Sequence, residues 1–145
     1  MKHPLHSTRR ALLLAALLTS TASAWAQEGV KVVYHLNEGV QQAARAIGNI
    51  RNHLDAEPRT KIVVVTHGLG IDFLLEGAKD SNGRSFAGGI GDLAGRGVEF
   101  RVCNNTLVGR NISKDQVVLE ARVVPSGVAE IGRLQAKEAF VYLRP

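Results

Sequence analysis

The chain has 145 residues, a formal net charge of +5 and a single cysteine. This length is enough for one domain and not two, and a lone cysteine excludes an internal disulfide framework. Residues 27–145 keep a net charge of only +2 and contain no basic run, because three basic residues lie in the first 26. Aromatic residues are also few, so the composition argues against nucleic-acid binding.

The first 26 residues are predicted to be a cleaved signal peptide. Lys2, Arg9 and Arg10 give a positive start, and the apolar run 11–18 is followed by small residues in A-x-A arrangements. This layout is typical of export, and the run is too short for a permanent membrane helix. The arginine pair resembles the twin-arginine motif, which leaves the twin-arginine and general secretory routes both open. We therefore expect one domain over 27–145, periplasmic or secreted, with no membrane contact after cleavage.

The first half of that domain begins with a strand and a helix. Residues 31–36 are β-branched and aromatic, which predicts a strand, and a helix follows that Asn37 caps and Pro58 ends. The apolar run 61–66 predicts a second strand, covered on both faces. Short helices are predicted at 71–78 and 86–94, on either side of turn residues.

The second half continues the alternation. Residues 98–103 and 121–124 are predicted strands. Ser126 caps a helix that runs to Lys137 with its apolar side formed by Val128, Ile131 and Leu134, and 139–143 is a fifth strand. The pattern predicts an α/β fold: a flavodoxin-like parallel sheet of about five strands with helices on both faces.

Ligand sites of such sheets lie beyond the carboxyl ends of the strands. His35 lies near the end of the first strand, His67 follows the second, and Cys103 ends the third. Cys103 is the candidate catalytic residue, because a thiolate is a nucleophile and the polar turn Asn104-Asn105-Thr106 offers N–H groups to stabilise it. A small buried structural cysteine is the alternative, and the residues alone leave the two equal.

The order and spacing of five fragments resemble the DsrE/DsrF-like sulfur-relay family: Val32-Val33-Tyr34-His35, Val65-Thr66-His67-Gly68, Gly97-Val98-Glu99-Phe100, Cys103-Asn104-Asn105-Thr106-Leu107 and Val124-Pro125-Ser126-Gly127-Val128. The resemblance implies a homo-oligomer, a trimer or hexamer, and a cysteine that carries sulfane sulfur as a persulfide. Cys103 stands at the matching position. The implied role is a sulfurtransferase-type sulfur carrier that meets a donor or acceptor protein and needs no cofactor, with turnover left open.

Five further residues are expected to line the pocket around the thiol: His35, His67, Gly68, Asn105 and Thr106. The two histidines and Cys103 would make a donor set suited to zinc or copper, but their spacing matches no metal motif, so no metal is predicted. His53 is expected to be solvated. The competing function is a non-catalytic oligomeric module that binds a small ligand or metal and has a structural cysteine.

Overall fold

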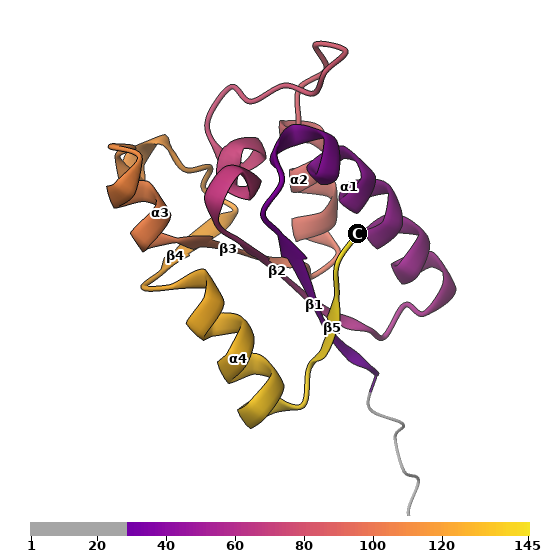
Figure 1. Ribbon diagram of the computed structural model, residues 1–145. Coiled ribbons are helices and arrows are strands. Elements are labelled where there is room, and N and C mark those ends of the chain that lie inside the picture. Colours follow the sequence, from indigo (N-terminus) through magenta and orange to yellow (C-terminus); the bar gives the residue numbers. More distant parts are fainter. Residues whose placement is uncertain (1–28) are drawn as a thin grey trace, which may run out of the picture.

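The computed structural model describes residues 29–145 (Figure 1). In it the β-branched segments form a parallel sheet, and helices connect its strands. The strands are β1 (Lys31–Leu36), β2 (Lys61–Thr66), β3 (Glu99–Cys103), β4 (Ala121–Val124) and β5 (Val141–Leu143). Their order is β4-β3-β2-β1-β5, and all neighbours are parallel. The predicted fold class, a five-stranded parallel α/β sheet, is confirmed. The predicted signal peptide, 1–26, lies outside the described residues.

Helices cover both faces of the sheet, as Figure 1 shows. One face carries α1 (Gly39–Ala56), the 3-10 helix η1 (Gly68–Leu74), α2 (Ala87–Gly95) and α3 (Asn104–Gly109), which share the larger apolar core. The other face carries α4 (Gly127–Glu138), whose Ile131 and Leu134 pack on Val33, Val63 and Val65. A further short turn of helix, η2 (Lys114–Gln116), precedes β4. Within residues 29–145, no helix has the length and apolar character needed to cross a membrane.

Three predicted helix details are wrong at their ends. Asn37 does not cap α1: Glu38 occupies the N-cap, and the side chain of Gln42 accepts the N–H groups of Asn37 and Glu38 at 2.8 and 2.9 Å. The helix expected at 71–78 is η1, which starts earlier and ends at Leu74. Val128 is 65% exposed, because it lies in the first turn of α4 beyond the edge of the packed surface.

Two further differences concern the segment after Cys103 and the start of the fifth strand. The turn expected after Cys103 is the short helix α3. The fifth strand starts at Val141 rather than at 139, because Ala139 takes the left-handed conformation (φ 57°) that ends α4. Phe140 then points into the core below α4. The predicted strands 31–36, 61–66 and 121–124, the helix cap at Ser126 and the extent of α2 agree with the structure to within one residue.

Candidate functional site

Cys103 lies at the topological switch point of the sheet. The chain leaves β1, β2 and β3 toward the face of α1, but it leaves β4 toward the opposite face, where α4 begins. Two neighbouring strands whose loops part in this way open a crevice at their carboxyl ends, where ligands of α/β proteins bind. Cys103 ends β3 opposite Val124 of β4. The cysteine therefore occupies the place in this fold where a ligand is most expected.

The surroundings of the Cys103 sulfur favour the thiolate. Burial is the largest single influence and opposes ionisation, since the residue is only 4% exposed. Against it act the N–H of Gly127, the hydroxyl and N–H of Thr106 and the N–H of Asn105. Together these donors hold the pKa of Cys103 below its usual value. The sulfur is thus buried and still predisposed to ionise, which is unusual for a purely structural cysteine.

Gly127 lets the first turn of α4 approach the cysteine. A Cβ at this position would lie 3.1 Å from the carbonyl oxygen of Thr66, 3.2 Å from Cβ of Cys103 and 3.3 Å from Cβ of His67. A side chain at this separation would be tighter than most real contacts, so its neighbours would have to move by a few tenths of an ångström. The close approach brings the Gly127 N–H, at the positive end of α4, to the sulfur.

Replacing Gly127 by alanine should push α4 away from the thiol. We expect the midpoint of the pH dependence of Cys103 alkylation to rise, because the first of the favourable donors is withdrawn. The packing strain should lower the free energy of unfolding by about 1–3 kcal/mol. Gly132→Ala in the same helix is the matched control, since nothing lies within 4 Å of its added Cβ. An unchanged alkylation midpoint in Gly127→Ala would show that this N–H does not stabilise the thiolate.

A pair of histidines lies next to the cysteine on the same face of the sheet. His35 on β1 and His67 after β2 stack with ring centroids 4.8 Å apart, and their Nε2 atoms are 2.7 Å apart. Nδ1 of His35 lies 2.6 Å from the hydroxyl of Tyr142 on β5. Burial lowers the pKa of both histidines, and the neighbouring His67 and Arg144 lower that of His35 further. These shifts favour the neutral form of both rings, in which one Nε2 donates a proton to the other.

The structure brings all six predicted site residues to this end of the sheet. The N–H of Gly68 does not point at a ligand: it donates to the hydroxyl oxygen of Thr106 at 3.0 Å, and so orients that hydroxyl. Thr106 presents its N–H to the sulfur, and the N–H of Asn105, which donates to the carbonyl oxygen of Pro125 at 3.3 Å, also favours the thiolate. His53 was expected to be solvated, but its Nδ1 lies 2.9 Å from the hydroxyl of Tyr34 on the α1 side.

Two residues that sequence reasoning missed are Gly127 and Tyr142. Gly127 follows a helix cap directly, where glycine is uncommon enough to signal a close approach. Tyr142 belongs to a short edge strand, and nothing in its local pattern links it to His35, which lies 107 positions away. Only the pairing of β5 with β1 places the two together.

The arrangement does not form a metal centre. Among residues 29–145, no three His, Cys, Asp or Glu side chains are grouped so that they could hold a metal ion. The two Nε2 atoms face each other at hydrogen-bond distance, which leaves no space for an ion between them. The Cys/His₂ donor set considered from the sequence is therefore not assembled here.

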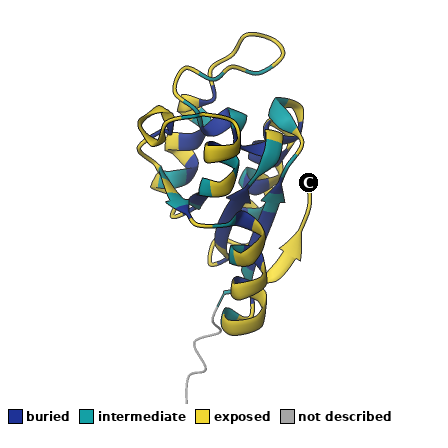
Figure 2. Cartoon of the chain, turned by 60° about the vertical axis from the view of Figure 1, so that its left-hand side comes forward, coloured by how far each residue is buried: buried dark blue, intermediate teal, exposed yellow. Residues whose placement is uncertain are grey.

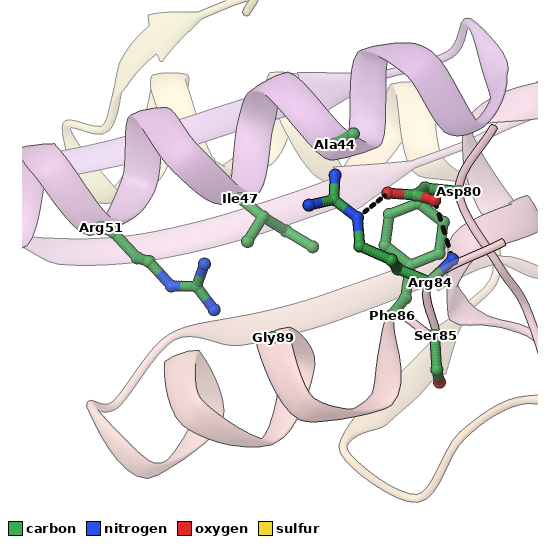
Figure 3. Close-up of a pocket in the computed structure, with 8 residues that line it drawn as sticks. All are labelled: Ala44, Ile47, Arg51, Asp80, Arg84, Ser85, Phe86 and Gly89. Atoms are coloured by element: carbon green, nitrogen blue, oxygen red, sulfur yellow. Dashed lines mark hydrogen bonds and ion pairs between the residues drawn. The ribbon is translucent and has the colours of Figure 1, made fainter. Parts of the chain in front are cut away.

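A separate cavity of about 240 Å³ lies between α1 and α2 (Figure 3). Its two arginines are already paired, Arg84 with Asp80 at 2.9 Å and Arg51 with Asp92 at 3.2 Å. The lining includes Ser85 but no histidine or cysteine. This cavity therefore offers no activated nucleophile and no free charge for a ligand, and the Cys103 end of the sheet remains the candidate site.

Comparison with known proteins places the chain in one family. The sequence profile of the DsrE/DsrF-like family matches residues 3–143. A protein of unknown function, MTH1491 from Methanobacterium thermoautotrophicum, has a similar structure with a TM-score of 0.71 and 30% identity, covering 80% of this chain and 99% of that one. The ychN protein from E. coli has a TM-score of 0.67 over the same shares at 14% identity, which shows the fold alone. A search of curated proteins found no match.

Proposed function

The chain belongs to the DsrE/DsrF-like family, and from this premise we propose that it is a sulfur carrier that holds sulfane sulfur as a persulfide on Cys103. The observation that carries the proposal is the set of hydrogen-bond donors around the sulfur. A persulfide forms when a thiolate attacks the sulfane sulfur of a donor, and these donors stabilise the thiolate in spite of its burial. They would stabilise the persulfide anion in the same way.

The position of Cys103 suits exchange with a partner molecule. Cys103 ends β3 at the N-cap of α3, and Gly127 at the start of α4 and His67 before η1 lie beside it. An added sulfur atom extends the reach of the side chain by about 2 Å, the length of an S–S bond. A persulfide would therefore reach further from β3 than the thiol does, which shortens the approach that a donor or acceptor protein has to make.

The burial of Cys103 is the observation that favours the competing function. A sulfur on a residue that is 4% exposed is also what a structural cysteine in a small-ligand binding module would show. The two functions differ in how folding changes the reactivity of the thiol. A carrier needs a thiol that the fold activates, whereas a binding module has one that the fold protects.

Alkylation by iodoacetamide tests this difference. In the folded protein we expect the rate to follow a titration midpoint below that of the chain in denaturant, because the pKa of Cys103 is lowered on folding. At neutral pH the folded thiol should then react faster than the unfolded one, since a larger fraction is ionised. The pseudo-first-order rate, measured by mass spectrometry between pH 5 and 9, provides both values. Reaction only in denaturant would support the binding module instead.

We place this carrier outside the cytoplasm as a homo-oligomer, as the sequence of residues 1–26 and the family suggest. The edge strand β5 supports the second part of this proposal. Its side chains Val141, Tyr142 and Leu143 are all exposed, and Figure 2 shows the strand as a fully exposed arrow at the border of the sheet. Exposed apolar edge strands are commonly covered by a second chain.

A further inference from the structure

Three side chains continue from Cys103 across the carboxyl end of the sheet. Val65 of β2 pairs with Arg101 of β3, so His67 and Cys103, each two residues further, start from neighbouring positions on the α4 face. A Cβ added to Gly127 would lie 3.3 Å from Cβ of His67 and 3.2 Å from Cβ of Cys103. Nε2 of His67 lies 2.7 Å from Nε2 of His35, and Nδ1 of His35 lies 2.6 Å from the hydroxyl of Tyr142.

We propose that Cys103, His67 and His35 form a catalytic triad for sulfur transfer, in which His67 moves the proton and His35, held by Tyr142, positions it. This inference rests on the function proposed above and adds the group that serves as acid and base. Enzymes activate a thiol or hydroxyl by placing a base next to it and a third group that orients the base. Here the third member is a neutral imidazole rather than a carboxylate.

Two tautomer arrangements satisfy these hydrogen bonds, and the triad uses the one that leaves Nδ1 of His67 unprotonated. If His67 donates its Nε2–H to Nε2 of His35, then His35 carries its other proton on Nδ1 and donates it to the oxygen of Tyr142. Nδ1 of His67 is then a free lone pair, and it has no partner among the described residues. It is the nitrogen left to serve Cys103. Catalytic hydrogen bonds of this kind are commonly long until substrate is bound.

The transfer balances without an oxidant or reductant when the donor is a low-molecular-weight persulfide, R–S–SH. The thiol of Cys103 gives its proton to Nδ1 of His67, and the sulfur attacks the outer, sulfane sulfur of the donor. A bond forms between Sγ and that sulfur while the S–S bond of the donor breaks, and its electron pair leaves on R–S⁻. This thiolate takes the proton back from Nδ1 of His67. The products are the persulfide of Cys103 and R–SH.

The charges around the pair suit a base that works near neutral pH. Burial, the neighbouring His67 and Arg144 lower the pKa of His35, and burial lowers that of His67, so the neutral form of both rings is favoured. Arg144 is itself paired with Glu38, and on α4 the carboxylate of Glu130 is held by Arg101 and Arg133. No carboxylate contacts either ring among the described residues. As the pH falls and the pair gains a proton, His67 can no longer accept one from the thiol.

The test compares two reactions of the same thiol in the full-length folded protein. Sulfur uptake from cysteine persulfide releases a thiolate, which in the proposed mechanism takes a proton from His67, whereas alkylation by iodoacetamide releases iodide, which takes none. For His67→Gln we expect single-turnover uptake at pH 7 to fall about 100-fold, the lower end of general acid–base effects. Alkylation should stay within about three-fold of wild type, because the main-chain donors that favour the thiolate remain.

Two substitutions of His35 test its positioning role, and Tyr142→Phe and Tyr34→Phe serve as test and control for its hydrogen bond to Tyr142. His35→Gln keeps an oxygen that accepts the Nε2–H of His67 and should retain most of the uptake rate, whereas His35→Leu should lose about 10-fold. Tyr142→Phe should change the tautomer of His35, which the ring ¹⁵N chemical shifts report. Tyr34→Phe breaks the equivalent bond to His53 on the other face of the sheet, and should change neither uptake nor the shifts of His35 and His67.

The outcomes separate this inference from the proposed function. If wild type takes up no sulfur, the carrier function itself is wrong. If it does, and His67→Gln takes up sulfur within three-fold of wild type between pH 5 and 8, the triad is wrong and the carrier function stands. An equal loss of uptake and alkylation in His67→Gln would also overturn the triad, because it would show that His67 does not return a proton to the leaving thiolate, the step that only uptake includes.

Discussion

Folded protein incubated with inorganic polysulfide should gain one sulfur atom, about 32 Da, and Cys103→Ser should gain none. The expectation follows from the single thiol of the chain and from the donors that stabilise its anion. Dithiothreitol should remove the added mass, since a persulfide is reduced by a thiol whereas a sulfinic acid is not. Intact-mass spectrometry measures both steps, and the loss in the serine variant should be complete.

The serine variant must remain folded for this result to count. Serine is close in size to cysteine, and the change at the end of β3 should cost no more than about 1–3 kcal/mol. Its hydroxyl can accept the N–H groups of Thr106 and Gly127. Circular dichroism and a urea titration check the fold. Sulfur added equally fast to the denatured chain would refute the carrier function, because it would show that the fold contributes nothing.

The second large effect is expected at Gly70, where alanine should destabilise the domain by about 4 kcal/mol or more. An added Cβ would lie 2.2 Å from the carbonyl oxygen of Leu36 and 2.6 Å from the backbone nitrogen of Asn37. Both are main-chain atoms at the end of β1, so the strand or η1 must move as a whole. Leu36 also accepts the N–H of His67 at 3.2 Å, so the displacement would reach the histidine pair.

Gly48→Ala is the control for this substitution. Gly48 lies in the middle of α1 on its exposed side, and nothing lies within 4 Å of its added Cβ. Alanine there should raise the free energy of unfolding by about 0.5–1 kcal/mol, because glycine is the weaker helix former. Urea titrations of both variants measure the difference. A Gly70→Ala protein within 1 kcal/mol of wild type would mean that η1 is not pressed against β1.

The ion pairs of a buried arginine show that charge partners cannot be predicted from the sequence alone. Arg101 lies in a strand and is only 4% exposed, with ion pairs to Glu99 on its own strand and Glu130 on α4. In the sequence it interrupts an apolar run, and nothing local indicates its partner 29 positions away. The buried arginine is explained only by the helix that packs over it.

The sequence by itself determined the α/β class and the place of the strands. Alternating periodicities are local, and β-branched runs such as 61–66 report directly that a strand is covered on both faces. A single cysteine leaves one candidate thiol without any structure. The rule that sites follow the carboxyl ends of parallel strands then selected His35 and His67 as candidates. In the structure His67 lies beside Cys103, and His35 lies against His67.

Only the tertiary structure decided which atoms meet. The order β4-β3-β2-β1-β5 puts the last strand beside the first, and with it Tyr142 beside His35. The reversal after β4 brings Gly127 onto the sulfur of Cys103, which lowers the pKa of a thiol that burial alone would raise. These contacts depend on strand order and on the crossing of main chains, which are set by how the faces of the whole sheet are covered. No window of the sequence contains both partners, so no local pattern encodes them.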